Sequence, residues 1–395
     1  MIKRVPADFI VEEKAGLPLR QAGEYRVYEL RKSGWTTPDI IRRWSRAKDI
    51  PESLISYGGK KDKHGITSQY VAARDKRDLG LRGEDFSLEA VGFMDRPMGP
   101  DLILANAFKV TIRSIPDTAP LERSIEEAGR WGFPNFFDDQ RFRSLDPERG
   151  FFAEKILRRH WNGALQVYLT SVPEKASKSE RERKARLLAS WRDWTACLGL
   201  AREPLEKTIF AHLARRPKDY PGALRLIPED EVAMRYAAFQ SHLWNELLRR
   251  LLRKRVGALE EVNGRDGNYL FWRRLDADLL GHLGPLEIPT AAANPSFPDE
   301  LTASLYAGIV EEEGLRPGLF RTKELRRVGF RSFKRRALLI PRDLRVLEKG
   351  EDDLRAGKKK LAISFSLPRG AYGTMLIKRL ELDFGEDRGP LENGE

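Results

Sequence analysis

The sequence is short of cysteine, of clustered histidine and of long apolar runs, and each shortage excludes a class of protein. The single cysteine, Cys197, cannot form an intramolecular disulfide or build a cysteine-based metal site. The histidines are scattered, and none falls at the spacing of a zinc-binding His-Glu-x-x-His motif, so no metal site is predicted. They are His64, His160, His212, His242 and His282. No apolar run approaches the roughly 20 residues of a membrane span, and residues 1–14 lack the apolar stretch of a signal peptide. We therefore expect a soluble, cytoplasmic protein with no membrane partner.

Common cofactor and nucleophile motifs are missing as well. A phosphate-binding P-loop around Gly59 and Lys60 would need glycine at position 54 and serine or threonine at position 61, which hold Leu54 and Lys61. No Gly-x-Ser-x-Gly turn indicates acyl transfer, and no convincing glycine-rich strand-to-helix turn indicates the cofactor of a methyltransferase. The helix expected at 231–248 is too apolar on one face to read a DNA groove. We predict no cofactor.

What the sequence has in excess is positive charge. Lys and Arg number 71 against 59 Asp and Glu, which gives a net charge of +12 and a pI of about 9.6. This surplus suits a polyanionic partner, nucleic acid before an anionic membrane, although basic residues also serve solubility alone. It is concentrated in 155–192, with ten basic and three acidic residues, and in 321–360, with fifteen and six. Aromatic residues lie between these charges, so the two segments are predicted to line a cleft for a phosphate backbone.

Alternating apolar residues near both ends of the chain predict a sheet. Phe108, Val110 and Ile112 fall on one face of a strand, and residues 361–367 alternate in the same way. Because the two ends carry strands and the middle carries helix signals, we predict an α+β fold. Its core is a mixed, largely antiparallel sheet interrupted by a helix-rich, inserted α/β domain. The predicted domain boundaries are 1–155 and 336–395 for the interrupted domain, including a flexible tail at 385–395, and 156–335 for the insert.

Three helices are predicted from capping residues and periodicity. The first begins near residue 37, with Thr37 as its N-cap and Pro38 at its first helical position. The second extends from Ser179, in capping-box spacing, to Gly199. The third, in 231–257, carries apolar residues three or four apart over about six turns.

The stretch SYGGKKDKHGITSQYV at 56–71 places one carboxylate, Asp62, among Lys60, Lys61, Lys63 and His64. Nearby cations favour the ionised form of a carboxylate, so Asp62 is expected to stay charged and to be able to act as a nucleophile or a base. From these residues alone, a loop aspartate making exposed ion pairs is the more common explanation.

Several motifs, in order along the chain, resemble the TruD family of tRNA pseudouridine synthases. The stretch YGGKKDKHGITSQYV resembles the family's Gly-x-Lys-Asp motif with its Thr-x-Gln ending, and Asn106 with Phe108 resembles its Asn-x-Phe strand. Lys3 precedes a Pro-x-Asp-Phe-x-Val pattern, and PNFFDDQRFRS at 134–144 resembles the second signature. SHLWNELLRRLL, KRRALLIP and FSLPRGAYGTMLIKRL resemble later segments, so the resemblance extends from residue 3 to about residue 380. The chain departs from the family pattern at Gly65, Asp138, Arg143 and Arg379.

The resemblance implies a pseudouridine synthase that needs one aspartate and no cofactor. Asp62 would be the catalytic aspartate, and Lys3 would approach it and fix its orientation. Phe137 would stack on a uridine that has been flipped out of the RNA, and Asn135 would position the Phe137 loop. Gln69, Thr67 and Arg141 would have supporting roles. The residues assigned to substrate binding are Lys3, Lys61, Gln69, Asn135, Phe137 and Arg141.

The resemblance further implies tRNA as the partner, with uridine 13 of the D arm as the target, and makes the interrupted domain the catalytic one. A monomer is expected, since it leaves the cleft open. Two alternatives stay open: a synthase acting on another uridine, and a noncatalytic RNA-binding protein. Both would share the charge pattern, but only the binding protein would function without Asp62.

Overall fold

The computed structural model describes residues 2–321 and 328–384, which form two compact units. The first consists of residues up to Phe133 together with those from Leu339 onward, and the second is Pro134–Leu338. Strands β8 (Phe133–Pro134) and β13 (Leu338–Leu339) pair with each other at the two points where the chain passes between the units. The predicted domain boundaries, after residues 155 and 335, stay a prediction, and the predicted flexible tail lies outside the described residues.

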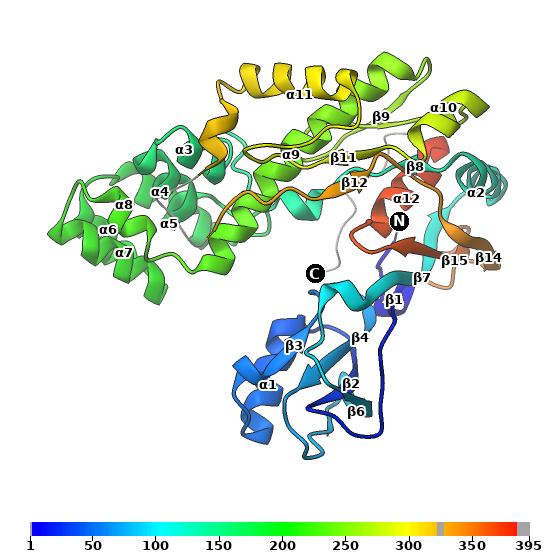
Figure 1. The fold of residues 1–395 in the computed structure, drawn as a ribbon, viewed down its shortest axis with the longest axis horizontal. Coiled ribbons are helices and arrows are strands. Elements are labelled where there is room, and N and C mark those ends of the chain that lie inside the picture. The colour runs from blue at the N-terminus through cyan, green and yellow to red at the C-terminus, as the bar shows by residue number, and fades with distance from the viewer. Residues whose placement is uncertain (1, 322–327, 385–395) are drawn as a thin grey trace. The chain divides into compact units, whose positions relative to one another are not determined.

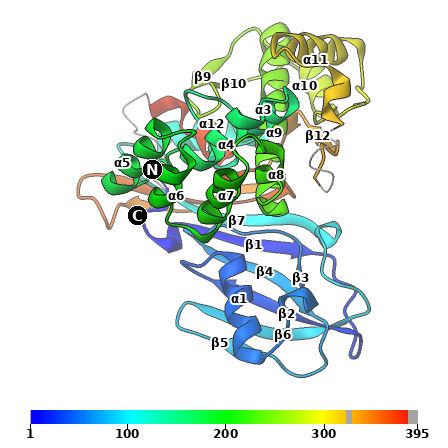
Figure 2. The same ribbon diagram turned by 90° about the vertical axis from the view of Figure 1, so that its left-hand side faces the viewer.

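The first unit is built on one nine-stranded sheet in the order β14-β15-β7-β1-β4-β2-β6-β5, with β3 pairing beside β4 (Figure 1; β5 is labelled in Figure 2). Its strands are β1 (Phe9–Ala15), β2 (Tyr25–Lys32), β3 (Ile55–Tyr57), β4 (Ile66–Ala73), β5 (Leu81–Arg82), β6 (Phe86–Met94), β7 (Ile103–Ile115), β14 (Arg342–Glu351) and β15 (Lys359–Pro368). The pair β1 and β4 is parallel, and the other pairs are antiparallel. The predicted α+β class with a mixed, largely antiparallel sheet is therefore confirmed.

The alternating residues of β7 and β15 form the core of this sheet, as predicted. Phe108, Val110 and Ile112 are buried, and the two strands pair antiparallel with Phe108 opposite Phe365. These two rings stack with their centroids 4.9 Å apart. Aromatic side chains directly opposite each other stabilise neighbouring strands. The pair therefore helps hold β15 in register with β7, although the whole second unit separates the two strands in sequence.

Three helices accompany the sheet: α1 (Thr37–Lys48), α2 (Ala119–Trp131) and α12 (Gly373–Leu380). Helix α1 covers one face of β2 and β4, where Ile40 and Trp44 pack against Tyr28 and Val71 (Figure 2). The predicted N-cap of this helix is wrong by one residue. The hydroxyl of Thr36, and not of Thr37, accepts a hydrogen bond from the Asp39 backbone N–H at 3.2 Å.

The second unit is mostly helical, with short strand pairs (Figure 1). Its helices are α3 (Phe152–Leu157), α4 (Trp161–Thr170), α5 (Lys178–Ala189), α6 (Trp194–Leu200), α7 (Pro204–Arg215), α8 (Tyr220–Leu224), α9 (Glu229–Arg255), α10 (Ala277–Leu283) and α11 (Glu300–Glu312). Strand β9 (Glu260–Val262) pairs with β10 (Tyr269–Phe271), and β11 (Glu287–Pro289) with β12 (Lys334–Arg336). The predicted apolar stripe of α9 is buried, from Val232 to Leu251, and forms the centre of this unit.

The single helix predicted from Ser179 to Gly199 is wrong. The hydroxyl of Ser177 caps α5 two residues earlier, and the chain leaves the helix at Ser190 before α6 begins at Trp194. Asp193 accepts a hydrogen bond from the Ala196 N–H at 3.0 Å and so starts a new helix. The break folds Trp194 back so that its ring packs edge-on against Trp191, 5.2 Å away. Packing of these two indole rings against each other outweighs the helix propensity of the intervening residues.

In the described part of the chain, no helix is both long enough and apolar enough to cross a membrane. Part of one predicted basic segment is not exposed to solvent. In 155–192, Arg183 and Lys184 are buried and paired with Glu206, so they are not available to a polyanion. In 321–360, residues 322–327 lie outside the described residues.

Candidate active site

The loop that carries Asp62 spans residues 58–65, between β3 and β4, and we call it the Asp62 loop. Strand β4, which follows it, lies parallel to β1 with Ile66 opposite Ile10. Parallel strands begin at the same edge of a sheet, so the segment before β1 and the segment before β4 meet there. This topology brings Lys3 to Asp62 across 59 residues of sequence.

Lys3 and Asp62 form an ion pair that is largely shielded from solvent. The Lys3 ammonium donates to Oδ2 of Asp62, and the backbone N–H of His64 donates to Oδ1 at 3.0 Å. The side chains are 2% and 17% exposed, respectively. Burial raises the pKa of Asp62, but the charge and hydrogen bond of Lys3 and the His64 N–H outweigh it, and the net pKa is lowered. Asp62 is therefore an anion at neutral pH.

The short segment that carries Lys3 is held by Asp8. The Asp8 carboxylate accepts hydrogen bonds from the N–H groups of Arg4 and Val5, at 3.0 and 3.1 Å, and from Arg113 Nε at 2.8 Å. These bonds hold Lys3 at a φ of +62°, a left-handed conformation that costs a residue with a side chain about 1–2 kcal/mol. This strained backbone directs the Lys3 side chain toward the Asp62 loop, with its ammonium 4.0 Å from the centre of the Phe9 ring.

The other lysines of the Asp62 loop do not pair with its carboxylate. Lys61 is directed to the neighbouring strands, where its ammonium lies 2.7 Å from Oε2 of Glu13 and donates to Oδ1 of Asn106 at 2.6 Å. Lys60 and Lys63 are exposed. The cation that contacts the carboxylate is thus Lys3, from a distant part of the chain, rather than a neighbour in sequence.

Hydrogen bonds with Gln69 and Thr37 hold the first residues of the Asp62 loop. The Thr37 hydroxyl donates to Gln69 Oε1 at 2.7 Å and accepts from the Lys61 N–H at 3.1 Å. Gln69 Nε2 donates to the Gly59 carbonyl at 3.0 Å. Gln69 is fully buried, so in this arrangement it supports the loop. Gly65 closes the loop, and a Cβ added there would overlap the Phe9 carbonyl oxygen.

Sequence reasoning missed a second cation at the base of this loop, Lys32. Its ammonium donates to the carbonyl oxygens of Asp62 and Trp35, each at 2.8 Å, and its side chain is almost fully buried. Burial lowers the pKa of Lys32 to about 8, against the opposing effect of the Asp62 charge. The signal was available, because Lys32 continues the inward-facing series of Tyr28 and Leu30 on β2, where a lysine is unusual.

Asn135, Phe137 and Arg141 lie in the second unit and are described there by themselves. Phe137 is 3% exposed, with its ring edge-on to Trp244 at 5.6 Å. The Arg335 guanidinium lies over the Phe137 ring at 4.1 Å and that of Arg141 at 5.6 Å. Arg335 Nε also donates to the Asn135 carbonyl at 2.9 Å, so the segment 135–137 and Arg335 form one packed cluster.

Asn245, on α9, clamps the backbone of Phe137. Its Oδ1 accepts from the Phe137 N–H at 2.8 Å, and its Nδ2 donates to the Phe137 carbonyl at 3.0 Å. Asn245 is fully buried. Its position in SHLWNELLRRLL was recognisable as a polar residue within an apolar helix face, but its partner could not be identified from sequence.

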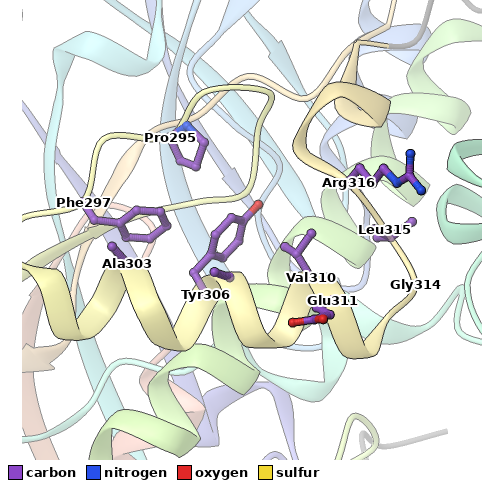
Figure 3. A pocket seen from close by; sticks show the side chains of 10 residues that line it. Pro295, Phe297, Ala303, Tyr306, Val310, Glu311, Gly314, Leu315 and Arg316 are labelled. Carbon is purple, nitrogen blue, oxygen red and sulfur yellow. The ribbon is translucent and has the colours of Figure 1, made fainter.

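A cavity of about 680 Å³ lies beside α11 in the second unit. Figure 3 shows Phe297 and Tyr306 together at one end and Arg316 at the other. None of the sequence-predicted site residues lines it. Across the described ranges, no three His, Cys, Asp or Glu side chains gather closely enough to hold a metal ion.

Comparison with known proteins gives a consistent result. The sequence model of the tRNA pseudouridine synthase D (TruD) family matches residues 1–267 and 285–380. The "tRNA pseudouridine synthase D" proteins of Leptospira interrogans and Aquifex aeolicus are each 28% identical to the chain; the alignments cover 96% of this chain and 96% and 97% of theirs. The crystal structure of the putative tRNA pseudouridine synthase D from Methanosarcina mazei matches with a TM-score of 0.70 at 23% identity, over 96% of this chain and 92% of that one. This last likeness establishes a shared fold.

Proposed function

Because the chain belongs to the tRNA pseudouridine synthase D (TruD) family, and is therefore a pseudouridine synthase and an isomerase, we propose that it converts a uridine of tRNA to pseudouridine with Asp62 as its catalytic carboxylate. The target that we propose is uridine 13 in the D arm. The observation that carries the assignment of Asp62 is its shielded ion pair with Lys3.

The chemistry requires an ionised carboxylate next to the nucleoside. The bond from ribose C1′ to uracil N1 breaks, the base turns, and C1′ bonds to C5, which then loses its hydrogen. Asp62 acts either by attacking carbon or by removing the C2′ proton, and both roles need the anion. RNA phosphates close to the site would raise the pKa of a lone carboxylate, and the Lys3 charge opposes that shift.

The target uridine has to leave the stack, at a cost of a few kcal/mol. We assign Phe137 to stack on the extruded base, since base stacking on an aromatic ring is worth about 1–3 kcal/mol. The ring is 3% exposed, so a base would reach it only after Arg335 or Arg141 moves aside. Asn135 and Arg141 position this segment, and Lys61 and Gln69 position the Asp62 loop.

No cofactor enters this mechanism. The protein would act as a monomer in the cytoplasm, where tRNA is processed. Its net charge of +12 supports binding through phosphates, so affinity for tRNA should fall steeply as salt is raised.

The test is tritium release from tRNA that carries 5-tritiated uridine, because isomerisation expels the hydrogen on C5. We expect release by the wild type, none by Asp62→Asn, and wild-type release by the control Asp95→Asn, an exposed aspartate paired with Arg20. Each protein is assayed above its measured Kd for tRNA. A tRNA with cytidine at position 13 should release one equivalent of tritium less than the same tRNA with uridine at that position.

The possible outcomes distinguish the proposed role of Asp62, the proposed target uridine and the RNA-binding alternative. Equal release by Asp62→Asn and the wild type would refute the role of Asp62. Unchanged release from the cytidine 13 tRNA would refute the proposed target while leaving the synthase activity standing. Binding without release from any tRNA would favour the noncatalytic RNA-binding alternative.

A further inference from the structure

Lys32 is a buried cation in contact with the backbone of the candidate catalytic residue. It lies at the end of β2, and its ammonium bridges two carbonyl oxygens, those of Asp62 and Trp35, both at 2.8 Å. Trp35 immediately precedes Thr36, the N-cap of α1. One side chain thus connects the Asp62 loop, the start of α1 and the sheet.

A buried lysine at this position lowers the stability of the fold compared with an apolar residue. Burial of an ammonium group costs several kcal/mol, and the neighbours of Lys32 on the inward face of β2 are Tyr28 and Leu30, which need no charge. A methionine would fill similar space without the desolvation. The charge and the two donated hydrogen bonds are therefore the properties that distinguish Lys32 from its apolar neighbours.

The contacts of Lys32 and Lys3 with Asp62 are complementary. Lys3 holds the carboxylate by its Oδ2 atom, and the His64 N–H holds Oδ1. Neither of these contacts fixes the peptide group of Asp62. Lys32 does, through the carbonyl oxygen, so rotation of the Asp62 backbone would break its bond to Lys32.

We propose that Lys32 is a positioning residue for the isomerisation. It holds the Asp62 backbone at a fixed position relative to the start of α1, so that the carboxylate, which Lys3 orients, faces the nucleoside. This inference rests on the proposed role of Asp62. Lys32 acts through Asp62 and need not touch the RNA.

The charge of Lys32 gives this role a signature in the pH dependence. Asp62 and Lys61 are the charged groups that act on the Lys32 ammonium, while Lys3 and His64 act on the Asp62 carboxylate. Because the pKa of Lys32 is lowered to about 8, its charge is lost as the pH rises through about 8. The chemical step should slow over that range, since a neutral amine holds a carbonyl less strongly than an ammonium does.

The experiment is single-turnover tritium release from tRNA, with the enzyme in excess and above its Kd, by the wild type, Lys32→Met and the matched control Lys184→Met, between pH 6 and 9.5. Lys184 is also buried and also donates to a backbone carbonyl, that of Leu169 at 2.6 Å, but it belongs to the second unit. We expect Lys32→Met to lower the rate about 100-fold at pH 7, with Kd for tRNA within twofold of wild type, because small misplacements of a reacting group cost that much. Lys184→Met should lower the melting temperature and leave the rate of the folded enzyme unchanged.

A second variant keeps the test decisive if Lys32→Met does not fold. Lys32→Arg retains a cation that does not titrate in this range, so it should keep part of the activity and lose the alkaline decline near pH 8. A wild-type rate in Lys32→Met, or a wild-type alkaline decline in Lys32→Arg, would overturn the inference while Asp62→Asn remained inactive. Absence of release by the wild type would instead overturn the proposed function.

Discussion

The clamp of Asn245 on Phe137 makes a quantitative prediction for the second unit. Asn245→Leu keeps the size of the side chain but removes both hydrogen bonds to the Phe137 backbone, at 2.8 and 3.0 Å. The matched control is Asn162→Leu in the same unit, which removes one half-buried bond, from Trp191 Nε1 at 2.9 Å.

The expected cost follows from burial of the clamp. Asn245→Leu removes two hydrogen bonds to the Phe137 backbone in a buried site, and loss of such a partner costs about 1–3 kcal/mol for each bond. The sum for Asn245→Leu is about 2–6 kcal/mol. For a domain of this size each kcal/mol lowers the melting temperature by about 2–4 °C, so the transition should fall by roughly 4–24 °C. Asn162→Leu should cost about 1 kcal/mol or less, since water can replace a half-buried partner.

Calorimetry of the two variants and the wild type measures this difference, and tritium release at 20 °C shows whether the loop also matters for the reaction. If Phe137 receives the base, Asn245→Leu should lower kcat/KM for tRNA while the control does not. A fall of less than about 2 °C for Asn245→Leu, equal to that of Asn162→Leu, would refute the reasoning about the clamp.

Three further predictions concern charge. In Lys3→Met, burial of Asp62 is no longer opposed by the ammonium, so the acid limb of the pH–rate profile should move to higher pH, and an unmoved limb would contradict the ion pair as its cause. Desolvation of the half-buried His242 lowers its pKa, but its two carboxylate partners outweigh this and raise the pKa to about 9, above the ordinary 6.5. It should therefore contribute about 3 kcal/mol of stability below pH 6.5 that is lost as the pH rises toward 9, and urea unfolding of His242→Gln should lack this dependence. Lys60→Gln and Lys63→Gln, at exposed positions beside the site, should each weaken tRNA binding and reduce the salt slope by about one, with kcat unchanged, which titrations at several salt concentrations would show.

Local patterns predicted the framework of the fold well. The strands around Phe108 and Phe365 and the long helix from Glu229 to Arg255 follow directly from the spacing of apolar residues, which burial then enforces. Caps were harder, because serine and threonine residues close together in sequence are chemically equivalent candidates. Thr36 takes the cap of α1, which leaves the Thr37 hydroxyl to hold Lys61 and Gln69.

The site could be predicted only in part, for a physical reason. The motif around Asp62 suggested a cation-rich environment, but Lys61 is directed to the neighbouring strands; Lys3 contacts the Asp62 carboxylate and Lys32 its backbone carbonyl. Both reach Asp62 through sheet pairing, which is not visible in a local window. The family resemblance supplied Lys3 because it extends over the whole chain, whereas Lys32 lay outside the quoted motifs.

The pairing of β15 with β7 has a consequence for biosynthesis. Strand β7 ends at Ile115, but its partner ends at Pro368, after the whole second unit. At about 5–20 residues per second, roughly 13–50 s separate the two strands as they are translated. Throughout that time one side of β7 is an open sheet edge, the kind of surface on which nascent chains aggregate. Ribosome-bound chains arrested before residue 342 should therefore recruit more chaperone than full-length ones, and equal recruitment would show that the growing second unit already shields that edge.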